Sequence, residues 1–185
     1  MKKIRFGVIG CGSIANEYHL PALRRVEGAQ LVWACDLIEE RAQKAKDDFG
    51  FEKYTLDYHD ILNDSSIDAV CIFTKIEMHA TLCIEAAAAG KHIFSQKPFA
   101  YNIEEGRNII RAVDEAGVKL TPSFMHSYMD GSIAARRIVE EGKIGEIRHI
   151  RMRNATKNPC DAAPCYGGCR MDIGCHGMDL IHTVA

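Results

Sequence analysis

Residues 4–15 read Ile-Arg-Phe-Gly-Val-Ile-Gly-Cys-Gly-Ser-Ile-Ala, and this stretch decides the fold. The apolar run at 4–9 has the composition of a buried strand, and the segment from Gly10 to Ala15 follows it with the spacing GxGxxA. In such a turn the first glycine permits the tight bend, the second lets backbone approach a pyrophosphate, and the small third residue permits close helix packing. The stretch therefore predicts a dinucleotide-binding strand, turn and helix, with phosphates on the N–H groups of the helix start.

Short β-rich runs alternate with helix-length segments along the next hundred or so residues. We expect strands at 30–35, 69–73, 92–94 and 119–121. We expect helices at 39–49, 81–89 and 104–116, each followed by a glycine that suits a left-handed cap. This alternation predicts an α/β fold, a Rossmann-type doubly wound parallel sheet with helices on both faces.

An acidic residue, Asp36, closes the second predicted strand about 20 residues beyond the glycine motif. A carboxylate there can accept hydrogen bonds from the adenosine ribose hydroxyls. It would also repel a 2′-phosphate, and Leu37 and Ile38 bring no positive charge. The sequence therefore predicts NAD rather than NADP, although Arg41 keeps the NADP alternative open. We expect the Asp36→Ala change to weaken NAD binding more than it perturbs stability.

The C-terminal third has a different pattern. A helix is expected at 133–141, an alternating half-buried strand at 146–153, and a loop rich in Pro, Asn, Asp, Cys and Gly at 154–168. We therefore predict a dinucleotide-binding domain at 1–122 and the beginning of an incomplete α+β substrate and oligomerisation domain at 123–185.

Composition narrows the classes of partner. The net charge is −2 and the basic residues are scattered, so a nucleic-acid or anionic membrane surface is not expected. No signal peptide or long apolar segment is recognised at the N-terminus, which favours a cytoplasmic location. A small molecule is the expected partner.

Two further segments carry chemistry. Lys97 and Pro98 come just after a predicted parallel strand, at the edge where open α/β sheets bind ligands. Asp172 and His176 are four residues apart, so on a helical turn the carboxylate could orient the imidazole. Histidine suits proton transfer near neutral pH, and a lysine supplies positive charge beside a developing alkoxide.

Taken together, these segments resemble the Gfo/Idh/MocA family, the group of glucose-fructose oxidoreductase and inositol dehydrogenase. The resemblance covers almost the whole chain. It runs through GxGxxA, Asp36, the segments at 67–70, 89–93, 97–98 and 145–149, and the Asp172/His176 segment.

The resemblance implies hydride transfer between a secondary alcohol of a sugar or polyol and a nicotinamide cofactor. By that analogy Lys97 hydrogen-bonds the reacting oxygen, His176 is the general acid/base, and Asp172 orients His176 or binds substrate. The residues that would contact the cofactor are Gly10, Gly12, Ser13, Ile14, Ala15, Asp36, Thr74, His79, Gln96 and Lys97.

The chain also departs from the family pattern. Gln96 stands where the family usually has Glu, and Thr74-Lys75-Ile76 replaces the common Thr-Pro-Asn. Family members run to roughly twice this length, so we interpret the chain as truncated in its C-terminal half. A strand at 146–153 without sheet partners would expose an edge, which predicts a homo-oligomer or association through that edge.

Eight cysteines need an interpretation. Cys11, Cys35, Cys71 and Cys83 lie in apolar periodic segments and are predicted to be reduced core thiols. The others have a spacing of x4, x3 and x5, unlike the paired CxxC of zinc sites, so we predict no metal, with a labile disulfide as an alternative. This second group is Cys160, Cys165, Cys169 and Cys175.

Two other functions stay open beside the dehydrogenase. One is a non-catalytic dinucleotide-binding remnant of the family. The other is a redox-cycling, NAD-dependent glycoside hydrolase, which would cleave an aryl glycoside without net accumulation of NADH.

Overall fold

The structure, a computed structural model, describes residues 2–155, 168 and 170–185. The chain divides into two compact units, Met1–Pro122 and Ser123–Ala185. Each unit has its own secondary structure.

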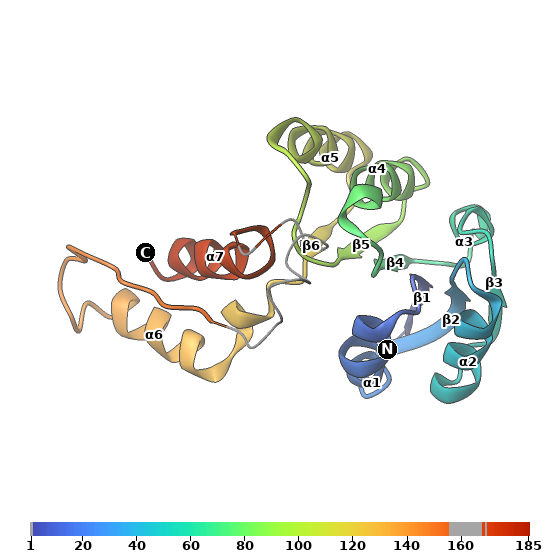
Figure 1. The fold of residues 1–185 in the computed structure, drawn as a ribbon, viewed down its shortest axis with the longest axis horizontal. Coiled ribbons are helices and arrows are strands. Elements are labelled where there is room, and N and C mark those ends of the chain that lie inside the picture. The colour runs from blue at the N-terminus through green and yellow to red at the C-terminus, as the bar shows by residue number, and fades with distance from the viewer. Residues whose placement is uncertain (1, 156–167, 169) are drawn as a thin grey trace. The chain divides into compact units, whose positions relative to one another are not determined.

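A six-stranded sheet with strand order β3-β2-β1-β4-β5-β6 forms the centre of the first unit (Figure 1). Every pair of neighbouring strands is parallel. This is the doubly wound arrangement predicted from the alternation of strands and helices, in which the carboxyl ends of all strands meet at one edge. The strands are β1 (Ile4–Ile9), β2 (Ala29–Cys35), β3 (Lys53–Thr55), β4 (Ala69–Ile72), β5 (His92–Ser95) and β6 (Leu120–Pro122).

Helical elements connect the successive strands of this sheet. The glycine motif leads into a π-helical turn, η1 (Ala15–His19), and a short helix, α1 (Leu20–Leu23). The predicted helix stops are confirmed at Gly50 and Gly117, which both adopt left-handed conformations at φ +78° and +65°. The remaining helical elements are α2 (Glu39–Phe49), α3 (His59–Asn63), η2 (Ile76–Met78), α4 (His79–Ala88) and α5 (Ile103–Ala116).

Apolar side chains alternate between the two faces of the sheet because successive strand residues point to opposite sides. Val8 belongs to the core beneath η1, α1 and α2, whereas its neighbour Ile9 belongs to the core beneath α3, α4 and α5. Figure 1 shows α4 and α5 on the opposite side of the sheet from α1 and α2. The sheet is thus covered on both faces and its strands are fixed in register.

The second unit is helical where it is described. It contains η3 (Met125–Tyr128), α6 (Asp130–Glu140), a π-helical turn η5 (Arg170–Gly174) and α7 (Cys175–Val184). Helix α7 packs against η3, α6 and η5. The helix expected at 133–141 is therefore present, and it begins a few residues earlier.

The prediction of a strand at 146–153 is wrong. These residues have no regular secondary structure, and nearly all of them are exposed. The alternating pattern is present, but a strand needs hydrogen-bonded neighbours, and no strand is described anywhere in the second unit. The proposed association through this edge thereby loses its structural basis, and self-association stays a prediction. Among the described residues, no helix is both long and apolar enough to cross a membrane.

Candidate active site

The glycine turn after β1 is held tightly at its first position. Gly10 adopts φ +97°, and its N–H donates to the carbonyl of Cys35 at 2.8 Å. A Cβ built at this position would lie 2.6 Å from the carbonyl oxygen of Phe73, which follows β4. Both the backbone conformation and the lack of space therefore require glycine here.

The second glycine of the motif has the opposite surroundings. A Cβ on Gly12 would meet no described atom within 4 Å. The turn around it is held by one side chain, because Asn16 Nδ2 donates to the carbonyls of Cys11 at 2.6 Å and Gly12 at 2.8 Å. A rigid backbone that faces open space suits the close approach of a phosphate group.

The residues that follow Gly12 separate into ligand-facing and core positions. Ser13 is exposed and Ile14 is 45% exposed, so both are available to a ligand. Ala15 is 1% exposed and packs into the core beneath η1. Ala15 therefore serves the motif through close packing of the helix on the sheet. Its side chain does not reach the surface.

Asp36 links the end of β2 to the glycine turn. Its carboxylate accepts the N–H of Cys11 at 2.8 Å through Oδ2 and the N–H of Ile38 at 3.0 Å through Oδ1. A carboxylate offers about four lone-pair sites, so further hydrogen bonds from ribose hydroxyls remain possible. Leu37 is 90% exposed, and no cation lies between Asp36 and Glu39.

The carboxyl edge of the sheet has two halves. We call residues 10–16 and 36–38, which follow β1 and β2, the β1–β2 half. Residues 73–79 and 95–98, which follow β4 and β5, are the β4–β5 half. A dinucleotide with its adenosine ribose at Asp36 and its pyrophosphate at the glycine turn would extend its nicotinamide toward the β4–β5 half.

The β4–β5 half carries the predicted lysine. Lys97 is half-buried, and its backbone N–H donates to Oε1 of the preceding Gln96 at 2.9 Å. The ring of His19 stacks on Phe73 with centroids 4.3 Å apart. Burial lowers the pKa of His19, and a hydrogen bond with Gln96 partly offsets this effect. Gln96 thus contacts both the backbone of Lys97 and the ring of His19.

The structure corrects the prediction that His79 contacts the cofactor. Its side chain is 0% exposed, and both ring nitrogens face backbone carbonyls. The sequence indicated the right region of the edge but not the direction of the side chain. Thr74, by contrast, is half-buried, and its hydroxyl donates to the carbonyl of Lys75 at 3.3 Å.

In the second unit, Asp172 lies in η5 and His176 in the first turn of α7. His176 is 8% exposed, whereas Asp172 is half-buried. His126 was not among the residues predicted from the sequence, and its ring stacks on His176 with centroids 4.2 Å apart. Phe124 packs edge-on against the same imidazole at 6.1 Å. Phe124 and His126 lie about 50 residues before His176, so no local sequence pattern indicates this contact.

Helix α7 is also fastened to η3 by polar groups. Ser127 donates a hydrogen bond to the carboxylate of Asp179. Thr183 Oγ1 donates to the carbonyl of Asp179 at 2.8 Å and lies 3.4 Å from Ser127 Oγ. These bonds hold the helix that carries His176 against the segment that carries His126.

The predicted site residues therefore fall into three groups. In the first group, the N–H of Gly10 donates to the carbonyl of Cys35 at the end of β2, and Asp36 accepts the N–H of Cys11 in the glycine turn. Gln96 and Lys97 are joined beyond β5. The third group, Asp172 and His176, lies in the second unit, whereas Lys97 lies in the first.

The four core cysteines are free and buried, as predicted. Burial is the main reason that their pKa values rise, to about 12 for Cys11, Cys35 and Cys71 and about 11 for Cys83. In the second group, Cys160, Cys165 and Cys169 lie outside the described residues, and the thiol of Cys175 donates to the carbonyl of Asp172 at 3.4 Å. No metal-binding group of three side chains is found among the described residues.

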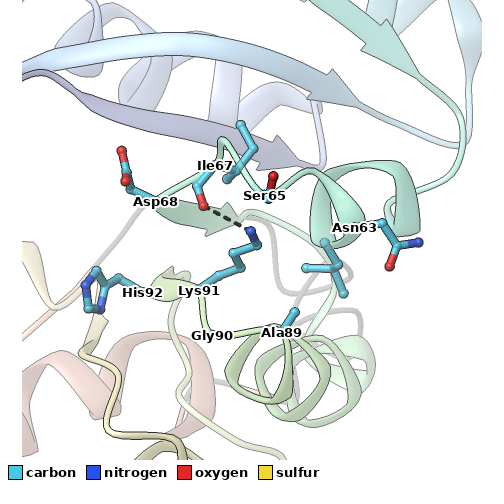
Figure 2. Close-up of a pocket in the computed structure, with 9 residues that line it drawn as sticks. Asn63, Ser65, Ile67, Asp68, Ala89, Gly90, Lys91 and His92 are labelled. Carbon is cyan, nitrogen blue, oxygen red and sulfur yellow. Dashed lines mark hydrogen bonds between the residues drawn. The ribbon is translucent and has the colours of Figure 1, made fainter.

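A cavity of about 590 Å³ lies at the other edge of the sheet, beside the amino ends of β4 and β5 (Figure 2). Lys91 is 5% exposed there, and its ammonium donates to the carbonyls of Asp64 at 2.8 Å and Ile67 at 3.0 Å. Asp68 accepts the N–H of Arg5 at 2.9 Å. These charged groups support the turn before β4, and open parallel sheets bind ligands at the opposite edge.

Comparison with known proteins gives matches along both units. Residues 4–124 match the oxidoreductase family with an NAD-binding Rossmann fold, and residues 133–185 match the GFO/IDH/MocA C-terminal domain. The scyllo-inositol 2-dehydrogenase (NAD(+)) of Bacillus subtilis is 30% identical over 180 residues, which cover 96% of this chain and 53% of that protein. The myo-inositol 2-dehydrogenase of Thermotoga maritima is 30% identical over 183 residues, or 98% of this chain and 54% of that protein.

Solved structures show the same likeness. The scyllo-inositol dehydrogenase of Lactobacillus casei with bound NAD(H) and scyllo-inositol has a TM-score of 0.89 and 27% sequence identity, covering all of this chain and 56% of that one. The chain thus spans about half the length of the curated relatives it matches. Because family matches extend over both units, the chain belongs to the Gfo/Idh/MocA family of oxidoreductases.

Proposed function

We propose that this chain is the nicotinamide-binding and catalytic part of an oxidoreductase that acts on a secondary alcohol of a polyol, with inositols as the first candidates. One observation carries the proposal. At the carboxyl edge of the sheet, Gly12 faces open space while Asp36 is fastened to the same turn through the N–H of Cys11. This arrangement offers a phosphate cradle and a ribose acceptor side by side.

NAD is the proposed cofactor. The backbone of the turn at Gly12 would hold the pyrophosphate, and Asp36 would accept the adenosine ribose hydroxyls. A 2′-phosphate would meet the negative charge of Asp36, and neither Leu37 nor Ile38 offers a cation, which disfavours NADP. The NAD(H)-bound Lactobacillus casei enzyme supports this choice.

When bound, NAD supplies the acceptor for the hydride. The alcohol must also lose its hydroxyl proton, and we assign this proton to the imidazole of His176, with Asp172 as the group that orients the ring or binds substrate. We assign to Lys97 the role of placing positive charge beside the oxygen as alkoxide character develops. The inositol dehydrogenases among the relatives support a polyol as substrate.

The two units would divide this work. We propose that Met1–Pro122 binds the dinucleotide and that Ser123–Ala185 is the beginning of the substrate domain. The stacking of His126 and the edge contact of Phe124 support a fixed imidazole plane at His176. A ring held in one plane favours proton transfer along one direction.

The test is reduction of NAD by a panel of inositols and sugars, followed through the absorbance of NADH. We expect turnover with at least one inositol and a loss of about 100-fold or more in kcat for the Lys97→Met and His176→Asn variants. Two matched controls should retain activity. These are Lys44→Met, an exposed lysine on α2 outside both halves of the edge, and His182→Asn, an exposed histidine on the same helix as His176.

Tight binding of NAD without turnover of any polyol would contradict the enzymatic assignment and favour a non-catalytic dinucleotide-binding protein. Hydrolysis of an aryl glycoside without accumulation of NADH would favour redox-cycling hydrolysis instead.

A further inference from the structure

His79 is the most completely buried ionisable side chain of the β4–β5 half. It is the first residue of α4 and is 0% exposed. Its Nδ1 lies 2.9 Å from the carbonyl oxygen of Pro98, and its Nε2 lies 3.2 Å from the carbonyl oxygen of Thr74. Since both partners only accept, the neutral ring donates through one nitrogen and the imidazolium through both.

The two carbonyls belong to different segments of the sheet edge. Thr74 follows β4, which ends at Ile72, and Pro98 follows β5, which ends at Ser95. These strands are neighbours, and their last residues, Ile72 and Ser95, are paired in register. One imidazole therefore lies between the two loops that leave adjacent strands, on the side where the nicotinamide is expected, and its neutral form donates a hydrogen bond to one of the two carbonyls.

The position of Pro98 gives this contact a functional consequence. Pro98 follows Lys97 directly, so a hydrogen bond to its carbonyl restrains the backbone that carries the lysine. On the other side, Gln96 Oε1 accepts the N–H of Lys97 at 2.9 Å. The lysine backbone is thus held from both sides.

We propose that His79 is a positioning residue that joins the loops after β4 and β5, so that Thr74 and Lys97 are placed for the nicotinamide half of the dinucleotide. This inference rests on the proposed function. Because the ring is fully buried, it acts through the two backbone carbonyls and does not touch the cofactor. Loss of His79 is therefore expected to weaken binding of the nicotinamide end strongly. Binding of the adenosine end, which the β1–β2 half holds, should change little.

This asymmetry defines the experiment. The 185-residue chain is titrated with NAD and with ADP by calorimetry, and the ratio of the two dissociation constants is compared between variants. His79→Phe keeps a ring of similar size but removes both ring nitrogens. We expect it to weaken NAD binding about tenfold, equivalent to one lost hydrogen bond of about 1.4 kcal/mol, with ADP binding changed less than about twofold.

His79→Gln retains a donor and should show a smaller change in the same ratio. It also decides the question if His79→Phe does not fold. As a control, His59→Phe alters a histidine that lies before β4 on another helix, α3, and should leave both affinities unchanged.

Equal weakening of NAD and ADP in both His79 variants would overturn the inference, since it would indicate general destabilisation of the domain. No change in either affinity would overturn it as well. If the wild-type chain binds ADP but gains nothing from the nicotinamide half, the positioning inference fails. If the wild-type chain binds neither compound, the proposed function itself fails.

Discussion

The two halves of the carboxyl edge are organised in different ways. In the β1–β2 half the geometry belongs to the backbone: a glycine at φ +97°, a second glycine facing open space, and a carboxylate that accepts two backbone N–H groups. In the β4–β5 half, buried or half-buried side chains determine the geometry. The ring of His79 lies between two backbone carbonyls there, and His19 stacks on Phe73.

The difference explains which half can be recognised in a sequence. A turn that depends on glycine leaves a short local motif, because few other residues fit its backbone conformation. A turn that depends on a buried imidazole leaves a single histidine, whose partners are carbonyls that any residue provides. The β1–β2 half is therefore legible from the sequence, and the β4–β5 half requires the structure.

Gly10→Ala should have the largest effect, a loss of stability that begins in the β1–β2 half. The added methyl would lie 2.6 Å from the Phe73 carbonyl oxygen in a left-handed conformation, so both crowding and strain oppose it. We expect a loss of about 2–4 kcal/mol in the free energy of unfolding, measured by urea denaturation. Gly12→Ala is the matched control and should change stability by less than about 1 kcal/mol. Equal losses would show that the two glycines are not distinguished by packing.

Gly12→Ala should in turn have a large effect on binding. Its methyl would occupy the open space in which we place the pyrophosphate. We expect NAD and ADP affinities to fall together by at least about tenfold, because both contain the pyrophosphate. Calorimetry of the two ligands measures this. The parallel loss is the opposite of the pattern expected for His79→Phe, and unchanged affinity would remove the phosphate site from the β1–β2 half.

Asp36→Asn should produce a smaller change, mainly in cofactor preference. The amide keeps the size of the side chain and one acceptor oxygen, so the bonds to the N–H groups of Cys11 and Ile38 are only partly lost. We expect NAD affinity to fall by about threefold to tenfold and the preference for NAD over NADP to narrow, because the repulsion of a 2′-phosphate is removed. An unchanged preference would contradict the role of Asp36 at the ribose. Asp36→Ala also removes both backbone bonds, so it is the less selective change.

Buried histidines and buried cysteines should make the protein lose stability at opposite ends of the pH range. Burial lowers the pKa values of His19 and His79 below the ordinary 6.5, so the unfolded chain takes up protons first and stability falls as the pH falls below about 6.5. Burial raises the pKa values of Cys11 and Cys35 from 9.0 to about 12, so stability falls as the pH rises above about 9.

Urea denaturation across this pH range tests the assignment. His19→Phe keeps a ring against Phe73 and should flatten only the acid side of the profile. Cys35→Ala should flatten only the alkaline side. A variant that changes both sides, or neither, would contradict the assignment of each side to one group of residues.

The sequence was most informative where local rules act. It predicted β1 with its bounds, the glycine turn, Asp36 at the end of β2, and helices that stop at Gly50 and Gly117. It missed β3, since Lys53–Thr55 is short and lacks a run of apolar residues.

Long-range contacts account for the other failures. The alternating pattern at 146–153 predicted a strand, but a strand also depends on neighbours that the pattern does not contain. His126 lies fifty positions before His176, and only the packing of η3 against α7 brings their rings together. His79 was placed at the correct edge, but its burial depends on the path of two separate loops.

The most direct test of the account is calorimetric titration of the 185-residue chain with NAD, ADP and NADP. If the dinucleotide extends from Asp36 across the glycine turn to the β4–β5 half, NAD should bind more tightly than ADP and at least about tenfold more tightly than NADP. Binding of NADP as tight as that of NAD, or no binding of NAD by the folded chain, would contradict it.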